Sequence, residues 1–189
     1  MKNIKKIINL IFELGTARNI LRGHHQALRQ SNDTISDHSF RVAIIGLLLA
    51  DMEKVNKSKV VEMCLLHDVA ELRTGDANFI NKFYREEKEE KAIKEQWFEM
   101  PGGKEIIKLL IEYNARKTKE AIVAKDADSL DQIFLQKEYF PENSYDLKRW
   151  HNHIAENLKT VSAKKIAKET LKINPLKWLY DFSENKRNK

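Results

Sequence analysis

Turn-forming residues are scarce in this chain, and their scarcity limits the folds that it can adopt. Only 6 glycines and 3 prolines occur among 189 residues, whereas an all-β domain needs turn residues after every short strand. The long stretches between them are rich in lysine, glutamate, alanine, leucine and isoleucine, which favour helices. The sequence therefore predicts an all-α fold, a single compact bundle of about seven to nine helices.

Apolar periodicity predicts where these helices lie. They are expected over residues 3–14, 36–53, 58–73, 85–99, 104–115, 118–138, 146–160 and 162–173. Residues 15–35 are predicted to be a turn with short helical pieces, and residues 76–85 to be irregular. Ser36 is expected to cap the second helix, and Gly75 to end the third.

The chain is long enough to bury a core of its own, and its length fits one domain. No internal repeat or linker-like stretch marks a boundary. We expect one domain over 1–189, in which residues 22–139 carry the functional groups and C-terminal helices over 146–180 pack on that core. The apolar segment 175–180 can pack either on the core or on a partner.

Charge and composition narrow the ligand and the location. The formal net charge of +6 suits an anionic ligand, such as a nucleotide, a nucleic acid or a phosphate ester, and charge alone does not choose among them. The single cysteine, Cys64, permits no intrachain disulfide, and the longest apolar run, 42–50, is too short to cross a bilayer. Glu13 and Arg18 interrupt the apolar start, which therefore does not resemble a signal peptide. A cytoplasmic protein that does not contact membranes is expected.

Histidines and aspartates interrupt three strongly apolar stretches that are expected to be helical. They are His38, the pair His67-Asp68, and the acids Asp126, Asp128 and Asp131. Each alone has an ordinary structural interpretation, as a helix cap, a paired core acid or a surface acid. Burying a carboxylate is costly unless it is paired or bound to a metal. Together, two imidazoles and two carboxylates suit an octahedral divalent ion, and they lack the thiolates of structural zinc.

The choice between two of these acids is not settled by periodicity. Over residues 121–135 the apolar side chains form one arc of the expected helix, and Asp126 falls inside it whereas Asp128 falls outside. Periodicity alone therefore favours Asp126 as the acid that points inward. A central helix can be buried on both sides, so this preference is weak.

Three strings carry a resemblance to a known family. They are Ser36-Asp37-His38-Ser39, then His67-Asp68-Val69-Ala70-Glu71 continuing to Thr74-Gly75-Asp76, and Lys125-Asp126-Ala127-Asp128-Ser129-Leu130. With them the chain resembles the HD-domain phosphohydrolases over residues 22–139, and within these the small group that includes the 5′-deoxynucleotidases. The resemblance implies one divalent metal ion, such as Mn, Co, Fe or Mg, held by four protein groups. The implied ligands are His38, His67, Asp68 and Asp128.

The same resemblance implies roles for residues around these ligands. Glu71 follows His67 by four residues, so the two are expected to share a helix face, and Glu71 is implied to act as general acid/base or to position water. Its structural alternative is a surface acid. Asp76 is implied to contact the substrate sugar or to position water, with a helix cap as its alternative.

An arginine ahead of the first histidine is implied to bind the substrate phosphate. Arg22 is the candidate, and Arg18 and Arg29 compete with it. The resembling proteins have a tryptophan after this arginine, but here Gly23, His24 and His25 follow. Selectivity for deoxyribose is therefore open. His24 or His25 can stack on the ligand in place of the tryptophan, and solvated loop histidines are the structural alternative.

These observations predict a metal-dependent phosphomonoesterase that acts on nucleoside 5′-monophosphates, deoxynucleotides included. One alternative is a phosphodiesterase or nucleotide triphosphohydrolase of another HD branch. Another is a non-catalytic protein that binds nucleotide or nucleic acid, although no helix-turn-helix or stripe of aromatic and basic residues supports nucleic-acid recognition. The resemblance also implies a homodimer with a small nucleotide substrate.

Overall fold

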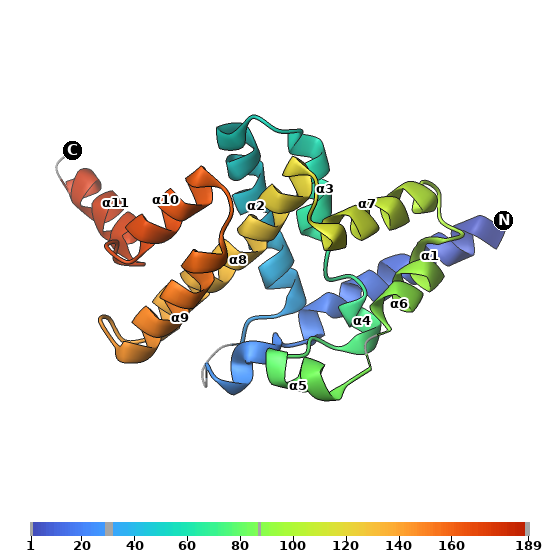
Figure 1. Cartoon of the computed structure of the whole chain (residues 1–189), viewed down its shortest axis with the longest axis horizontal. Coiled ribbons are helices and arrows are strands. Elements are labelled where there is room, and N and C mark those ends of the chain that lie inside the picture. Colours follow the sequence, from blue (N-terminus) through green and yellow to red (C-terminus); the bar gives the residue numbers. More distant parts are fainter. Residues whose placement is uncertain (1, 29–31, 87, 188–189) are drawn as a thin grey trace.

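The computed structural model describes residues 2–28, 32–86 and 88–187, which form a bundle of helices (Figure 1). Its elements are α1 (Lys2–Gly15), the 3-10 helices η1 (Thr16–Asn19) and η2 (Gly23–Gln26), α2 (Ile35–Glu53), α3 (Lys57–Leu66), α4 (Glu71–Thr74), α5 (Phe79–Tyr84), α6 (Glu89–Trp97), α7 (Gly103–Ala115), α8 (Lys119–Tyr139), α9 (Tyr145–Asn157), α10 (Val161–Thr170) and α11 (Lys177–Arg187). Nine α-helices within these ranges exceed six residues, which confirms the predicted all-α bundle. The described residues form no strand beyond an isolated bridge between Leu21 and Thr34.

Helices α2 and α8 form the centre of the bundle. They pack on each other and on α3, while α7, α9 and α10 also contact α8 (Figure 1). Side chains with almost no exposed surface, such as Leu49, Met63 and Leu130, fill the space between these helices. Any polar side chain on the inner faces of α2 and α8 is therefore removed from water.

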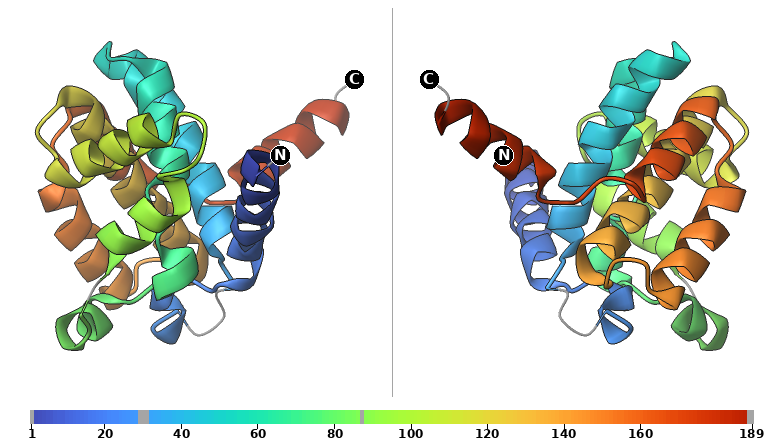
Figure 2. Two further views of the ribbon diagram at one scale, coloured as in Figure 1. Left: turned by 90° about the vertical axis from the view of Figure 1, so that its right-hand side faces the viewer. Right: turned by 90° about the vertical axis from the view of Figure 1, so that its left-hand side faces the viewer.

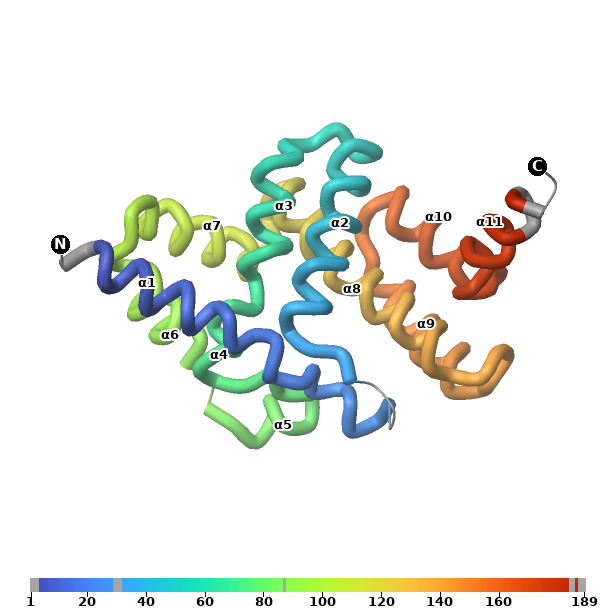
Figure 3. Tube along the Cα trace, turned by 180° about the vertical axis from the view of Figure 1, so that it is seen from behind, coloured from blue at the N-terminus to red at the C-terminus, as the bar shows by residue number. Residues whose placement is uncertain are grey.

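A second, smaller core joins α1 to the helices around α4. Leu10 of α1 packs there with Val69, Ile93, Trp97 and Leu110. Seen from behind, α1 lies across α4 and α6, and α1 and α11 lie toward opposite ends of the long axis of the molecule (Figure 3). This smaller core holds α4 in place beside the central helices.

The predicted helix over 58–73 is wrong as a single element, because α3 ends at Leu66 and α4 begins at Glu71. Between them the backbone amides bond three residues back, from Val69 to Leu66 and from Glu71 to Asp68. This tighter winding turns the following residues out of the register of α3. Gly75 ends α4 with a φ of 75°, so the predicted helix stop is confirmed.

Two further local predictions are corrected. Thr34, and not Ser36, caps α2: its side chain accepts the Asp37 amide while the Asp37 carboxylate accepts the Thr34 amide. The segment predicted to be irregular over 76–85 contains α5, whose first turn is capped by the Asn78 side chain. A short helix with such a cap lacks the length over which apolar periodicity becomes visible.

The C-terminal helices differ in how they contact the rest of the chain. Helices α9 and α10 pack on α8, with Leu147, Ala163 and Ala167 buried. By contrast α11 exposes Trp178 and Phe182, which are 70% and 62% accessible. Figure 2 shows α11 and α1 standing out from the body on the side where α2 lies. Among the described helices, none combines the length and apolar composition that a membrane span requires.

Candidate metal centre

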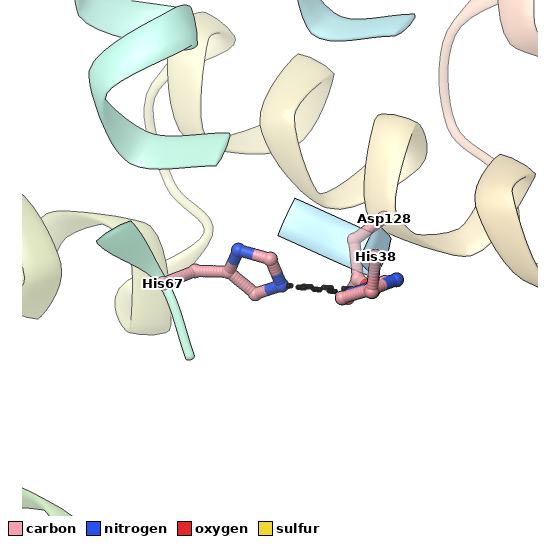
Figure 4. A group of neighbouring side chains, drawn as sticks. All are labelled: His38, His67 and Asp128. Carbon is pink, nitrogen blue, oxygen red and sulfur yellow. Dashed lines mark hydrogen bonds and ion pairs between the residues drawn. The ribbon is translucent and has the colours of Figure 1, made fainter. Parts of the chain in front are cut away.

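Three of the predicted metal ligands meet where α2, α3 and α8 come together. His38 lies in the first turn of α2, His67 directly follows α3, and Asp128 lies on the inner side of α8 (Figure 4). Nε2 of His38 is 3.3 Å from Nε2 of His67 and 3.2 Å from Oδ1 of Asp128. One ligand atom from each of the three lies within 4.8 Å of the others. The structure thus brings residues 38, 67 and 128 into one group.

A hydrogen bond at Nδ1 orients the imidazole ring of each histidine. Nδ1 of His67 lies 2.8 Å from the carbonyl oxygen of Cys64, and Nδ1 of His38 lies 2.7 Å from Oδ2 of Asp131. Because a carbonyl or a carboxylate can only accept, Nδ1 is the donor in each pair. The Nε2 atom of each ring therefore faces the group of candidate ligands. In this orientation Nε2 is the atom with which an imidazole binds a metal.

The fourth predicted ligand, Asp68, borders the same group. Its Oδ1 is 3.3 Å from Nε2 of His67, and its Oδ2 is 3.5 Å from Nε2 of His38. Oδ2 also accepts a hydrogen bond of 2.6 Å from Nη1 of Arg22. Asp68 is therefore shared between the histidines and a buried guanidinium.

Charge at this place suits a cation. Burial opposes ionisation of Asp128, but Lys125 and His38 hold the pKa of its carboxyl well below the usual range. Burial likewise opposes charge on His38, yet the hydrogen bonds to Asp128 and Asp131 raise the pKa of its imidazole to about 9. The carboxylates thus bind positive charge strongly here, whether it is a proton or a metal ion.

The donor atoms also suit an octahedral ion. Ligands at about 2.1 Å on neighbouring octahedral positions lie roughly 3 Å apart, close to the 3.2 and 3.3 Å separations around Nε2 of His38. Two imidazoles and two carboxylates, with no thiolate among them, are the ligand types that divalent Mn, Fe, Co and Mg accept. The residues present therefore fit a single divalent metal ion.

Comparisons with known proteins agree with this arrangement. The model of the HD domain matches residues 14–173. The chain belongs to the HD-domain family. That match contains all four predicted ligands and every helix that positions them.

Relatives of this HD-domain chain include proteins named 5′-deoxynucleotidase. One from Dictyostelium discoideum is 36% identical over 119 residues, which cover 57% of this chain and 63% of the relative. A human one is 32% identical over 58% of this chain and 56% of its own length. The chain thus spans less than two thirds of the curated relatives that it matches. A conserved hypothetical protein from Pyrococcus furiosus has a similar structure, with a TM-score of 0.72 and 27% identity over 88% of this chain and 99% of that one.

Two acids on α8 have separate roles, which decides the question that periodicity left open. Asp128 joins the histidines and also accepts hydrogen bonds from Tyr113 and Lys125, at 3.2 and 2.5 Å. Asp126 is equally buried, but it accepts the backbone amides of residues 159 and 160 at the start of α10. Both acids thus point inward, and Asp126 binds the backbone of a neighbouring helix whereas Asp128 joins the histidines.

Arg22 lies at the centre of the acidic side of this HD-domain site. It is 5% exposed, and its Nη1 lies 2.6 Å from Asp68, 3.0 Å from Asp76 and 3.5 Å from Glu71. The competing Arg18 instead donates to the carbonyl of Gly15, and Arg29 lies outside the described residues.

Glu71 is one of the acids around Arg22, but the helix that places it there differs from the one that the sequence indicated. The break after α3 places it in α4, so it does not share a helix with His67. Its side chain is buried beside Arg22. Burial, together with the charges of Asp68 and Asp76, raises the pKa of its carboxyl to about 9. A carboxyl with a pKa above 7 is mostly protonated near neutral pH, so it can donate a proton and can accept one only after it has ionised.

A close backbone contact explains why glycine follows Arg22. A Cβ on Gly23 would lie 2.6 Å from the Asn78 amide nitrogen and 3.1 Å from the Asp76 carbonyl oxygen. The amide of Gly23 also donates to the Asp76 carboxylate at 3.0 Å. No side chain fits at position 23, so the tryptophan of the resembling proteins cannot be accommodated with this path of the chain.

The two neighbouring histidines differ. Nδ1 of His25 bonds to the carbonyl of Arg22 at 2.8 Å. Nε2 of His24 is buried and finds no hydrogen-bond partner among the described residues. Burial and the charge of Arg22 lower the pKa of His24 to about 4, so its ring is neutral. A buried polar atom of this kind beside Arg22 suits a ligand contact.

Sequence reasoning did not find the residues that support His38. A surface position was one interpretation of Asp131, but its side chain is fully buried and bonds to both His38 and Arg41. A signal was present: Arg41 follows His38 by three residues, and Asp131 follows Asp128 by three, so each pair lies on one helix face.

Proposed function

We propose that this HD-domain chain is a divalent-metal-dependent phosphohydrolase that releases phosphate from nucleoside 5′-monophosphates, deoxynucleotides included. The observation that carries this proposal is the meeting of two inward-facing imidazoles and the Asp128 carboxylate beside a buried arginine. The names of the relatives support the substrate class. Small nucleotides, and neither membranes nor nucleic acids, are the proposed ligands.

The proposed metal ligands are His38, His67, Asp68 and Asp128. Mn, Co, Fe and Mg are the ions that this donor set favours. When bound, such an ion supplies Lewis-acid catalysis for the attack of water on phosphorus. The protein's own contribution is to keep both Nε2 atoms and both carboxylates directed at one point by burying them between α2, α3 and α8.

The remaining residues act on the substrate. Glu71 is the proposed general acid/base or water-positioning residue, because it is a buried carboxyl that lies beside Arg22, the guanidinium that also binds Asp68. Arg22 places its guanidinium opposite the phosphate and offsets its charge. Asp76 positions Arg22 and the η2 backbone, and contacts the substrate sugar or water. His24 offers a neutral ring and an unpaired nitrogen to the nucleoside.

A panel of nucleotides separates the proposed activity from its alternatives. Nucleoside and deoxynucleoside 5′-monophosphates, triphosphates and a cyclic dinucleotide are incubated with the full chain and Mn²⁺, Co²⁺ or Mg²⁺. Orthophosphate release from monophosphates is the expected result. Release of triphosphate, or cleavage of the diester, would favour another HD branch. No turnover with any ion, together with unchanged metal binding by His67→Ala, would refute the hydrolase.

The proposal includes a homodimer, and the outer face of α2 supports it. Besides its buried residues, this helix exposes five large apolar side chains about one turn apart, which form an apolar stripe. Each of these side chains belongs to a residue that is 36–69% accessible, and they are Phe40, Ile44, Leu47, Leu48 and Met52. Helix α1 lies on the same side of the molecule as α2 (Figures 2 and 3), and it exposes four large apolar side chains, Ile4, Ile8, Ile11 and Phe12. A helix that is apolar all round is normally buried on both faces.

The size of this surface favours a second copy of the chain. Nine large side chains of such exposure present on the order of 1,000 Å², more than the roughly 300–600 Å² of the largest patch on a typical monomer. A stable interface needs about 800 Å² per partner. The chain itself supplies two helices with exposed apolar side chains, α1 and α11, which stand out on the side of the molecule where α2 lies and can contact a symmetry mate (Figure 2).

Sedimentation equilibrium tests the dimer. Leu48→Glu, at a side chain that is 59% exposed, is expected to give monomers that still bind metal. Val161→Glu on α10, which is 64% exposed and outside the stripe, is the matched control and is expected to remain dimeric. A wild-type monomer at high concentration would contradict the dimer without affecting the proposed chemistry.

The proposal also includes a cytoplasmic location. The single, buried Cys64 supports a reducing, cytoplasmic location.

A further inference from the structure

Asp131 is a buried acid to which none of the proposed catalytic steps assigns a role. Asp131 of α8 is 0% exposed, and both of its oxygens are bonded. Oδ2 accepts a hydrogen bond of 2.7 Å from Nδ1 of His38, and Oδ1 accepts one from Nε of Arg41. Its carboxylate thus lies on the side of the His38 ring that faces away from the metal group.

The place of His38 in its helix explains why it needs such a partner. His67 donates Nδ1 to the carbonyl three residues earlier, on the turn of α3 that precedes it. His38 lies in the first turn of α2, and the Thr34 carbonyl already accepts its backbone amide. No earlier turn of α2 offers an acceptor to the His38 ring. The acceptor therefore comes from another helix, α8.

Arg41 holds this acceptor in place, because its Nε donates to Oδ1 of Asp131. Nη1 of Arg41 also binds both oxygens of Glu138 at 2.9 Å. Since Arg41 contacts two acids two helical turns apart on α8, its guanidinium cannot turn without losing both.

Two interpretations of Asp131 lead to different expectations. If it only joins α2 to α8 through Arg41, its loss should lower stability and leave the affinity of the folded protein for metal unchanged. If it acts through His38, its loss should release the imidazole to rotate or to move its proton from Nδ1 to Nε2, which blocks the ligand atom.

We propose that Asp131, held by Arg41, is a positioning residue that keeps the proton on Nδ1 of His38 and so directs Nε2 at the metal. Asp131 is not itself a ligand, because both of its oxygens face Nδ1 and Arg41. The inference rests on the proposed metal site and deepens it. In this proposal the Asp131 carboxylate on α8 orients the His38 ring on α2.

Calorimetric titration of the full chain with Mn²⁺ tests this inference. Asp131→Asn is expected to weaken metal binding by about 10- to 100-fold, the usual effect of removing a carboxylate that supports a histidine ligand. Asp126→Asn is the matched control, because Asp126 is a buried acid on the same helix that binds backbone amides instead of His38. It is expected to lower the unfolding temperature while leaving metal affinity within about 3-fold of wild type.

A second measurement needs no variant and covers the case in which Asp131→Asn does not fold. In ¹⁵N-labelled wild-type protein with Zn²⁺, a diamagnetic ion, His38 is expected to carry its ring proton on Nδ1. A proton on Nε2, or equal Mn²⁺ affinity for Asp131→Asn and wild type, would overturn the inference. Absence of any metal binding by wild type would instead refute the proposed metal site, so the two failures are distinguishable.

Discussion

The two halves of the candidate site are built from different kinds of structure. The metal-ligating half comes from long helices, α2 and α8, and from the end of α3, all of which pack into the main core. The half proposed to face the substrate comes from short segments, with Arg22 ahead of η2 and Glu71 in the four-residue α4. Helix packing fixes the first half, whereas ion pairs and one glycine contact fix the second. Substitutions in the two halves should therefore differ in what they change.

The largest effect is expected in the helical half. His67→Ala removes one of two imidazoles and should abolish tight metal binding, with a loss of several kcal/mol of transition-state stabilisation, or about 1,000-fold or more in rate. Phosphate release with Mn²⁺ or Co²⁺ and calorimetric metal titration measure both quantities. His153→Ala, at a histidine on α9 outside the group, is the control. Equal activity of His67→Ala and wild type would show that the helical half is not the metal site.

A smaller effect of another kind is expected from Arg22→Gln in the other half. The lost guanidinium should weaken nucleotide binding by roughly 2 kcal/mol or more, about 30-fold or above in KM, because a buried charge pair is broken. Metal affinity should change much less, since His38, His67 and Asp128 remain. Steady-state kinetics with a nucleoside monophosphate and metal titration of the same protein give the two values. A loss of metal binding as large as that of His67→Ala would mean that the two halves are not separable.

The glycine contact that supports Arg22 should have a measurable cost when it is disturbed. In Gly23→Ala the new methyl group would meet the backbone of Asn78, which cannot move like a flexible side chain. Overpacking of this kind costs about 1–3 kcal/mol, to be measured by urea unfolding. Gly15→Ala is the control, because a Cβ there meets only the end of the Arg18 side chain at 3.5 Å. An equally small effect at both positions would contradict the close approach.

The smallest effect concerns the ion pair that ties α4 to α1. Arg73 donates to both oxygens of Glu13 at 2.6 and 2.8 Å and lowers the pKa of that carboxyl. A lowered pKa in the folded state stabilises the protein above the unfolded pKa of about 4.3, and this contribution is lost as the pH falls through the folded value. Glu13→Gln should thus reduce stability at pH 7 by less than about 1 kcal/mol, because the pair is partly exposed.

Thermal unfolding from pH 7 to pH 3 measures this dependence. The difference between Glu13→Gln and wild type should shrink toward the acidic end, where the wild-type carboxyl is protonated. Lys172→Gln, which breaks an exposed pair with Glu169 on α10, serves as the control. A difference that stays constant across the whole range would exclude the ion pair as its cause.

The contrast between the halves also explains what could be predicted from the sequence. Long helices leave a periodic pattern, and the ligand strings lie on or directly after them, so the all-α fold and the group of His38, His67 and Asp128 were accessible. The break between Leu66 and Glu71 was not, because a shift to bonds three residues back leaves apolar periodicity almost unchanged. Nor was the role of Gly23, because it depends on backbone 53–55 residues further along the chain.

Asp131 lies between these extremes. Its spacing from Asp128 is visible in the sequence, but its partners His38 and Arg41 lie 93 and 90 residues away. An acid in a helix rich in charge is indistinguishable from a surface acid until the neighbouring helix is placed. The crossing of α2 and α8 decides which acids on α8 are buried, and that crossing is set by packing.

Helix α8 carries three acids within six residues, and each contacts a different part of the molecule: the start of α10, the metal group and the His38–Arg41 pair. The spacing of the three acids along α8 therefore has to match the positions of their three partners. Inserting one residue between Asp126 and Asp131 would rotate everything beyond it by about 100° and move it by about 1.5 Å, so at least one acid would lose its partner. This stretch should therefore tolerate many single substitutions better than any change of length, whereas the loop after α8 should tolerate length changes.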